Sequence, residues 1–324
     1  MMDSKKFLLQ PADPEQHFTS MADLYSNFES EPTTPKSLLE WYQKRLEHGI
    51  QLTVALTMEG NLAGLSAIYR DNLNLPNHYG LNLIVDPAFR RQGLGSRMYK
   101  ALIDQAEAWE ARYLRTRLRD NSDESLSFAL HRGFVQKKHS IEMKFDLSTW
   151  DETRYQPILV SLQAQGFHFT NMAELGDTME VRHKLFELNS RAAATDPGND
   201  GIAPWASFEE FNQNVCQSSW YRPEGQIVAI DTHTDVWAAM SAITVFSGSE
   251  HAHNLFTGTD VRYRGRKLAQ AVKSLALLQA RTFGVDCVCT NHDSENAAMI
   301  AVDTKLGYVR TPGMLILDKN LSEA

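Results

Sequence analysis

The apolar positions of the chain follow two alternating periods, which predict helices and strands in turn. A spacing of three to four residues between apolar side chains from Phe18 to Phe28 predicts a helix over 14–29. Short apolar runs bounded by Gly, Pro, Asn and Asp predict strands, two of which flank Glu59-Gly60-Asn61 as a hairpin. The first half therefore predicts a strand (7–12), two helices (14–29 and 35–49), the hairpin (51–57 and 62–69), a strand (78–85), a helix (93–109), a strand (113–119), a helix (123–131) and a final strand (134–147).

The second half of the chain predicts the same order of elements. After a helical run over 155–164, it predicts a strand (168–175), two helices (178–193 and 207–216), a hairpin around 232–235, a strand (253–259), a helix (267–283), a strand (285–290), a helix (296–306) and a strand (308–317). One constant offset of 174 residues aligns the halves, placing Arg90 on Arg264 and Gly133 on Gly307. The alternative is two unrelated α/β domains with a similar order of helices and strands, but one offset held over this length favours duplication of a single domain.

Length and composition agree with two α/β (α+β) domains. We predict an N-terminal domain over 1–148, a helical linker over 149–165 and a C-terminal domain over 166–324. An apolar fraction of 43% and a charged fraction of 22% exclude a disordered chain, a collagen-like chain and a coiled-coil rod.

Charge and cysteine content narrow the partners and the compartment. A net charge of −8 argues against nonspecific nucleic-acid binding. Three cysteines indicate a reducing compartment, and neither a secretory signal nor a membrane-spanning run is recognisable. We expect a cytoplasmic protein with no nucleic-acid or membrane partner, whose oligomeric state stays open.

A basic, glycine-bearing turn follows the strand that ends at Val85. It reads Arg90-Arg91-Gln92-Gly93-Leu94-Gly95-Ser96 and leads directly into the long helix. Helix N-termini present unpaired N–H groups and a partial positive charge, so a phosphate fits there if no Cβ blocks its approach. The turn therefore predicts an anion site.

This segment resembles the acyl-CoA pyrophosphate loop of the GNAT N-acyltransferase superfamily. The family pattern, Gln/Arg-x-x-Gly-x-Gly/Ala after a Val-x-Pro strand end, matches Arg90 to Gly95 at each fixed position. The distal signature, an Asn, a short helix and Leu-Gly-Phe, is similar to Asn291, Asn296 and Leu306-Gly307-Tyr308 in the second half. The resemblance implies two GNAT domains in tandem, each a mixed, mostly antiparallel sheet flanked by helices.

What the resemblance implies about chemistry is acyl transfer from acetyl-CoA to a primary amine by direct attack in a ternary complex. Lys267 stands where the first half has Gly93, so the second loop departs from the pattern and could either crowd the pyrophosphate or pair with it. The implied CoA-binding residues are Leu83, Ile84, Val85, Arg90, Arg91, Gln92, Gly93, Leu94, Gly95 and Ser96 in the first half and Thr259, Val261, Arg264, Gly265, Arg266, Lys267, Leu268, Ala269 and Asn296 in the second.

At the positions of the family's catalytic groups this chain carries other residues. Many family members carry a Tyr as general acid four residues before the glycine of the distal signature, where this chain has Ala129 and Asp303. Some members carry a carboxylate base on the fourth strand, where this chain has Tyr79 and His253. Either could be the base, although His253 also fits a solvated strand start. The pattern Glu250-His251-Ala252-His253 holds too few ligands for a metal site, so we expect none.

The acceptor is predicted as a small-molecule or peptide amine. Asp196 and Asp200 lie in a turn-rich loop that in this fold covers the acceptor pocket, where a carboxylate could bind a cationic amine, although simple turn chemistry also explains them. Two alternatives stay open: a CoA-binding sensor or scaffold without catalysis, and one catalytic half joined to one structural half.

Overall fold

The computed structural model describes residues 6–26, 28, 33–70, 77–197 and 204–322. The chain forms two compact units. The first comprises Met1–His139 together with Met314–Ala324, and the second comprises Ser140–Gly313. No helix of the described residues is both long and apolar enough to span a membrane.

The first unit is a mixed sheet with helices on both faces. Its strands lie in the order β1-β2-β3-β4-β5-β12, all antiparallel except the parallel pair β4 and β5. The elements are β1 (Phe7–Pro11), α1 (Pro14–Ser26), α2 (Pro35–Leu46), β2 (Ile50–Thr57), β3 (Leu62–Arg70), β4 (His78–Val85), η1 (Pro87–Phe89), α3 (Leu94–Ala108), β5 (Tyr113–Arg119), α4 (Asp123–Leu130), the start of β6 (Val135–Asp146) and the end of β12 (Val309–Asn320).

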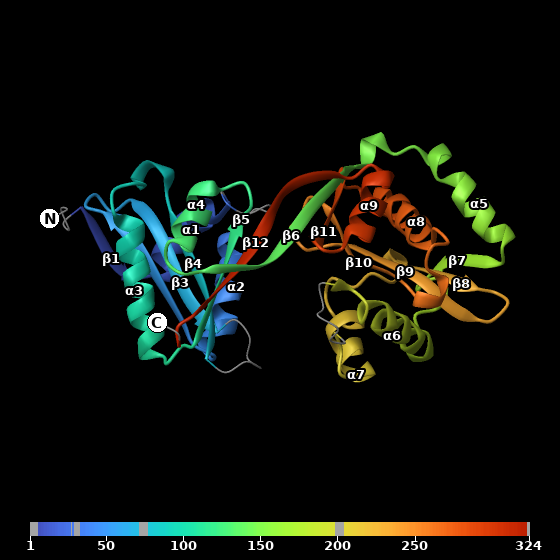
Figure 1. Ribbon diagram of the computed structural model, residues 1–324, viewed down its shortest axis with the longest axis horizontal. Helices are drawn as coiled ribbons and strands as arrows, with labels where there is room; N and C mark the ends of the chain where they lie inside the picture. The colour runs from blue at the N-terminus through green and yellow to red at the C-terminus, as the bar shows by residue number, and fades with distance from the viewer. Residues whose placement is uncertain (1–5, 27, 29–32, 71–76, 198–203, 323–324) are drawn as a thin grey trace. The chain divides into compact units, whose positions relative to one another are not determined.

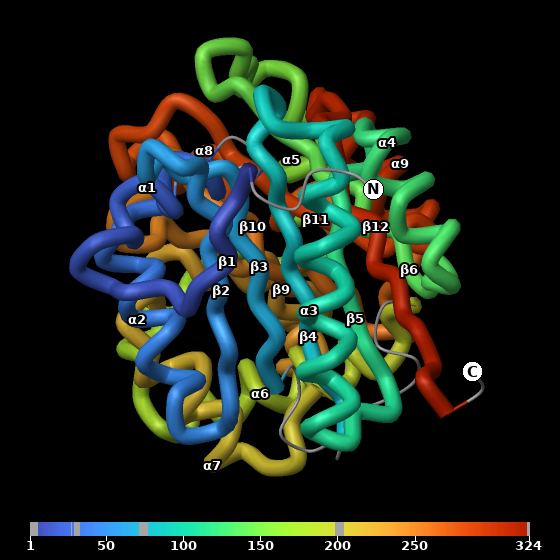
Figure 2. The backbone as a smooth tube through the Cα atoms, turned by 90° about the vertical axis from the view of Figure 1, so that its left-hand side faces the viewer, coloured from blue at the N-terminus to red at the C-terminus, as the bar shows by residue number. Residues whose placement is uncertain are grey.

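Strand β3 is the centre of this unit because both of its faces are buried. Leu65, Ala67 and Tyr69 alternate onto the face that packs against α1 and α2. Ile68 points to the opposite face, where it packs with Leu102 of α3. Helix α3 runs along β3 and β4 (Figure 2). The two-sided burial explains why β3 is a nearly continuous apolar run rather than an alternating one.

The second unit repeats this plan in the order β7-β8-β9-β10-β11-β6, again with one parallel pair, β10 and β11. Helices α6 and α8 cover opposite faces of its sheet (Figure 1). The elements are η2 (Leu147–Thr149), η3 (Glu152–Arg154), α5 (Gln156–Ala164), β7 (Phe167–Asn171), α6 (Met179–Ala193), α7 (Phe208–Phe211), η5 (Asn212–Cys216), η6 (Pro223–Gly225), β8 (Gln226–Asp231), β9 (Val236–Val245), β10 (Ala252–Thr259), η7 (Val261–Tyr263), α8 (Leu268–Thr282), β11 (Cys287–Asp293) and α9 (Ala297–Leu306).

The last strands of the two repeats are exchanged between the units. The sixth strand of the first sheet is the end of β12, where Met314 pairs with Arg119 and Asn320 with Tyr113. The sixth strand of the second sheet is the end of β6, where Asp146 pairs with Cys287 and Ser140 with Asp293. The boundaries expected at 148 and 166 therefore mark the repeat in the sequence, whereas the compact units divide within β6 and β12.

Most expected elements are present, and the expected mixed, mostly antiparallel sheet with flanking helices is confirmed in each unit. Two differ in form. The second helix of the second half is a short α-helix that continues as a π-helical turn over Asn212–Cys216. Strand β7 ends at Asn171, four residues earlier than expected, because Asn171 caps the following turn through the backbone N–H of Glu174.

Candidate functional site

In the first unit, β4 and β5 separate after a short parallel ladder. They pair only from His78 to Gly80 on β4, while β4 stays paired with β3 as far as Val85. At the point of separation the Thr116 hydroxyl donates a 2.9 Å hydrogen bond to the Leu81 carbonyl. Beyond it, backbone groups of β4 that face β5 have no strand partner and are available to a ligand lying along the strand.

The turn after β4 has the backbone that the sequence predicts for anion binding. Arg91 (φ 60°) and Gly93 (φ 83°) both adopt the left-handed conformation, and Gly93 is the N-cap of α3. No side chain bonds the N–H groups at this helix start. Because a Cβ on Gly93 would meet nothing within 4 Å, its positive φ and not steric room is what favours glycine there.

The separated strands and the turn open onto one cavity of about 1520 Å³. Among its lining residues are eight of the ten CoA-binding residues that the sequence indicates in this half: Leu83, Ile84, Val85, Arg90, Arg91, Gly93, Gly95 and Ser96. Gln92 and Leu94 are outside the lining. The Gln92 side chain donates to the Ala88 carbonyl, and Leu94 is buried in the core.

Helix α4 supplies residues to this site that the sequence did not indicate. Glu124 forms ion pairs with Arg90 at 3.4 Å and Arg91 at 3.8 Å. Arg132 donates to the Ser96 hydroxyl at 2.8 Å and stacks on the Phe128 ring. Three guanidinium groups thus lie around the start of α3, and no spacing in the sequence indicates that the turn after α4 would bring the Arg132 group there.

The other end of the cavity is aromatic. Tyr25, Trp41 and Tyr69 line it, with the Trp41 and Tyr69 rings edge to face at 5.2 Å between centroids. Its two acidic lining residues, Asp123 and Glu124, both belong to α4 rather than to this end. Tyr79, expected as a base, lies outside the lining. Its hydroxyl donates to the Trp109 carbonyl at 3.4 Å, so its position gives the expected role no support.

The second unit reproduces the backbone of this site. Strands β10 and β11 pair only at Ala252 and His253, and the Thr290 hydroxyl donates to the Asn254 carbonyl at 3.0 Å, as Thr116 does to Leu81. Lys267 (φ 67°) takes the left-handed N-cap position that Gly93 holds in the first unit.

The side chains around the second turn differ, because other parts of the unit bind its arginines. Arg264 donates to the Thr195 hydroxyl, Arg266 donates to the Gln165 amide oxygen at 3.1 Å, and Arg262 pairs with buried Asp260. The cavity at the separation of β10 and β11 measures only about 50 Å³. None of the residues indicated from Thr259 to Ala269 lines it.

Of the other residues that the sequence predicts for a site in the second unit, some line this small cavity and others do not. Asp196 and Asn296 line it, and the Asn296 amide donates to the Asp196 carboxylate at 3.5 Å. Asp200 lies outside the described residues. His253 contacts Phe246 and Ser249 and does not line the cavity. No group of three or more His, Cys, Asp or Glu in the described part of the chain could hold a metal ion.

Comparison with known proteins shows what the first repeat and the whole fold are similar to. Residues 18–134 match the model of the acetyltransferase (GNAT) family. A GCN5-related N-acetyltransferase from Sphaerobacter thermophilus is similar over 99% of this chain and 97% of its own, with 17% identity and a TM-score of 0.72. A tandem GNAT protein from the clavulanic acid biosynthesis pathway is similar over 97% of this chain and 98% of its own, with 16% identity and a TM-score of 0.68. The first repeat thus matches the GNAT family, and the whole chain has the fold of a tandem GNAT protein.

A third solved structure extends the likeness in fold. The glucosamine N-acetyltransferase region of a fungal multi-domain GH3 β-N-acetylglucosaminidase is similar over 98% of this chain and 38% of that protein, with 12% identity and a TM-score of 0.70. At these identities the structural likenesses show the fold, and the family rests on the match in the first repeat. No curated protein matches the chain.

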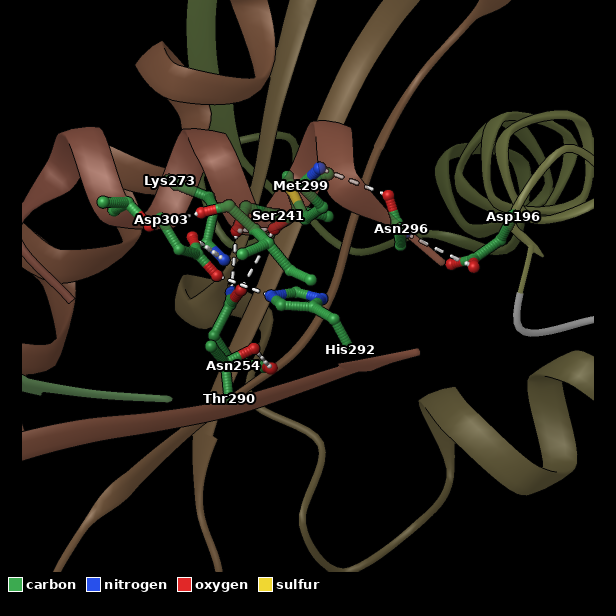
Figure 3. A network of polar contacts seen from close by, with 12 residues as sticks. Asp196, Ser241, Asn254, Lys273, Thr290, His292, Asn296, Met299 and Asp303 are labelled. Carbon is green, nitrogen blue, oxygen red and sulfur yellow. Dashed lines mark hydrogen bonds and ion pairs between the residues drawn. The ribbon is translucent and has the colours of Figure 1, made fainter. Parts of the chain in front are cut away.

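The two positions where many GNAT proteins carry a tyrosine have different surroundings in the two units. Ala129 lines the large cavity of the first unit and has no proton to donate. Asp303 is fully buried and forms an ion pair with Lys273, whose side chain is 1% exposed. The second oxygen of Asp303 lies 2.5 Å from Nε2 of His292 (Figure 3).

Burial dominates the electrostatics of this network. Removal from water lowers the pKa of Lys273, an effect that the adjacent Asp303 carboxylate opposes. Burial also raises the pKa of Tyr308 well above its usual value, with the charge of Asp303 adding to it. The Lys273 ammonium lies 5.1 Å from the centre of the Tyr308 ring. The sequence did not indicate this network, because nothing in the spacing of Lys273, His292 and Asp303 shows that these residues meet.

Proposed function

We propose that this protein transfers an acyl group, with acetyl-CoA as donor, to a primary amine. The observation that carries the proposal is the cavity of about 1520 Å³ in the first unit, because one space joins the basic turn, the start of α3 and the free edge of β4. The turn suits the pyrophosphate of CoA, and the free strand edge suits the amides of its extended arm.

The reaction needs no covalent intermediate on the protein. In a ternary complex the amine nitrogen attacks the thioester carbonyl, a C–N bond forms, and the C–S bond breaks with its electron pair leaving on sulfur. The nitrogen loses a proton and the sulfur gains one. In this proposal, backbone N–H groups of β4 near Leu83 polarise the carbonyl, and the cavity walls hold donor and acceptor together.

The aromatic end of the cavity is the proposed acceptor site. Its rings from α1, α2 and β3 offer apolar surface for the carbon skeleton of an acceptor, while the Arg45 guanidinium already lies over the Trp41 and Tyr69 rings at 4.7 and 5.0 Å. A small-molecule or peptide amine fits these surroundings better than a nucleic acid, since the chain carries a net charge of −8.

Thiol release tests the proposal. Wild-type protein with acetyl-CoA and a panel of primary amines is expected to release CoA thiol, and Arg90→Glu is expected to weaken CoA binding at least tenfold by calorimetry. Arg281→Glu, an exposed change of the same charge on α8, controls for the altered net charge. Tight CoA binding without thiol release from any amine would refute catalysis and leave a CoA-binding module.

A further inference from the structure

The aromatic end of the large cavity shares one face of the first sheet with polar groups of β4 and β5. Asn82 of β4 pairs with Ala67 of β3, whose side chain faces α1 and α2. Arg115 of β5 pairs with Gly80 of β4. Because side chains alternate along a strand, Asn82 and Arg117, two residues further on, point to that same face, and both line the cavity. One face of the sheet therefore holds the rings, an amide and a guanidinium.

Arg117 is a cation with no partner in the described part of the chain. It is exposed and lines the cavity, and no hydrogen bond, ion pair or ring contact joins it to another described residue. Arg115, two residues earlier on the same face, is held by the Asp318 carboxylate through hydrogen bonds of 2.8 and 2.9 Å. A guanidinium presents a planar set of N–H donors that matches a carboxylate, so Arg117 can hold an acidic ligand where Arg115 cannot.

The charges around Arg117 decide what such a ligand is. The acidic groups of the described lining, Asp123 and Glu124, belong to α4, and Glu124 already pairs with arginines of the turn. Arg119 of β5 also lines the cavity. The Arg45 guanidinium lies against the rings of the aromatic end, and its buried Nε has no hydrogen-bond partner among the described residues. Positive charge on this face attracts an acidic group and repels an amine that carries several positive charges.

We propose that the acceptor is an amino acid with an apolar or aromatic side chain, and that Arg117 binds its carboxylate. The proposal rests on the proposed function and names the acceptor class for the same site. The guanidinium donates two hydrogen bonds to the carboxylate, and the rings of Trp41 and Tyr69 pack against the side chain. The amide oxygen of Asn82 accepts a hydrogen bond from the amine, whose nitrogen attacks the thioester held at the free edge of β4.

The cavity is large enough for donor and acceptor together. Pockets for a single small ligand usually measure about 300–1,000 Å³, whereas this one measures about 1520 Å³. In the proposed function the donor takes the basic turn and the free edge of β4, which leaves the aromatic end and Arg117 for the acceptor. A Cβ on Gly80 would lie 2.5 Å from the Tyr69 ring, so the lack of a side chain there lets this ring pack against β4 beside Asn82.

The test uses full-length wild-type protein with acetyl-CoA and two sets of matched amines. One set is L-phenylalanine, its amide and phenethylamine, and the other is L-leucine, its amide and isopentylamine. Members of a set share the carbon skeleton and the amine and differ at the carboxylate. In the set that reacts faster, kcat/KM for thiol release is expected to be at least tenfold higher for the amino acid than for the other two members. Spermidine, which carries several positive charges, is expected to be a poorer acceptor still.

Variants at Arg117 separate binding of the carboxylate from a structural role. Arg117→Gln is expected to raise KM for the amino acid about 10- to 100-fold, with kcat and CoA affinity little changed, and to leave KM for the amide unchanged. Arg117→Lys keeps the charge and should recover part of the loss. Arg112→Gln is the matched control, because this exposed arginine before β5 lies outside the cavity lining and its loss changes the net charge equally.

The outcomes distinguish this proposal from the proposed function. Amides or simple amines that react as well as the amino acids, spermidine as the best acceptor, or an unchanged KM in Arg117→Gln would each overturn the acceptor class and leave the proposed function standing. No thiol release from wild-type protein with any amine would refute the proposed function, and the role of Arg117 with it.

Discussion

Replacing Lys273 with methionine is expected to destabilise the second unit by about 3–5 kcal/mol. The Lys273 side chain is 1% exposed and that of Asp303 is fully buried. Methionine fills most of the same volume, so the cost comes from charge rather than from a void. It leaves the Asp303 carboxylate buried with one hydrogen bond, from His292, in place of an ion pair and a hydrogen bond.

The same contacts predict how the stability of a second variant compares with that of Lys273→Met. A hydrogen bond contributes only about 0.5–1.5 kcal/mol net, which is less than the cost of a buried uncompensated charge. Changing Asp303 to leucine as well removes that charge. The double variant Lys273→Met/Asp303→Leu should therefore be more stable than Lys273→Met, although it removes two polar groups instead of one.

Urea unfolding with hydrogen-exchange mass spectrometry measures both effects. Exchange in peptides from α8 and α9 reports on the second unit, and exchange in α3 serves as an internal reference. Lys100→Met is the matched control, because this exposed α3 lysine forms a surface ion pair with Asp104 whose loss should leave stability essentially unchanged.

Two results would refute this reasoning. A cost below about 1 kcal/mol for Lys273→Met would show that the buried carboxylate finds compensation elsewhere. A double variant less stable than Lys273→Met would show that the pair stabilises the unit outright, against the usual balance of desolvation and attraction.

Three further predictions follow from single residues. The Arg262 guanidinium, by hydrogen bonding, holds the pKa of Asp260 well below its usual range, so the stability that Asp260 contributes is present above pH ~3.9 and lost as the pH falls further. Urea titrations at pH 7 and pH 3 should thus show Asp260→Asn less stable than wild type at pH 7, with the gap narrower at pH 3. Burial raises the pKa of the Cys216 thiol to about 11, so iodoacetamide at pH 8 should leave Cys216 unmodified in native protein but modify it in urea, as peptide mass spectrometry would show. In Gly64→Ala the new Cβ would lie 2.7 Å from the Ile84 carbonyl oxygen, and calorimetry should show a loss of about 1–3 kcal/mol.

The sequence predicts the local features of the site well because they depend on residues close together in the chain. The offset aligns Thr116 with Thr290, and both hydroxyls donate to the neighbouring strand, although the acceptors Leu81 and Asn254 differ by one position where β10 carries a bulge. The turn into α3 has the geometry expected of its glycine pattern. Lys267 shows that residue type alone does not predict this backbone, since Lys267 has the left-handed conformation of Gly93 although it is not a glycine.

The rest of the site depends on contacts that no periodicity contains. Arg132 and Glu124 reach the turn only through the packing of α4, and His292 meets Asp303 only because β11 and α9 are neighbours in space. The sequence does not predict the strand exchange either. Ile141 and Met143 of β6 and Leu315 and Leu317 of β12 hold corresponding buried positions, so these apolar positions do not show which sheet each strand completes.

The exchange of strands determines the order in which the two sheets can be completed during biosynthesis. Residues 140–313 contain every strand of the second sheet, so that unit can close while the chain is still growing. The first sheet must wait, although its first five strands emerge earlier, because Tyr113 on β5 pairs with Asn320. Until then β5 presents an unpaired edge, which favours association with other chains. The half made first is therefore completed last, and a nascent chain that stalls before residue 314 carries an open sheet.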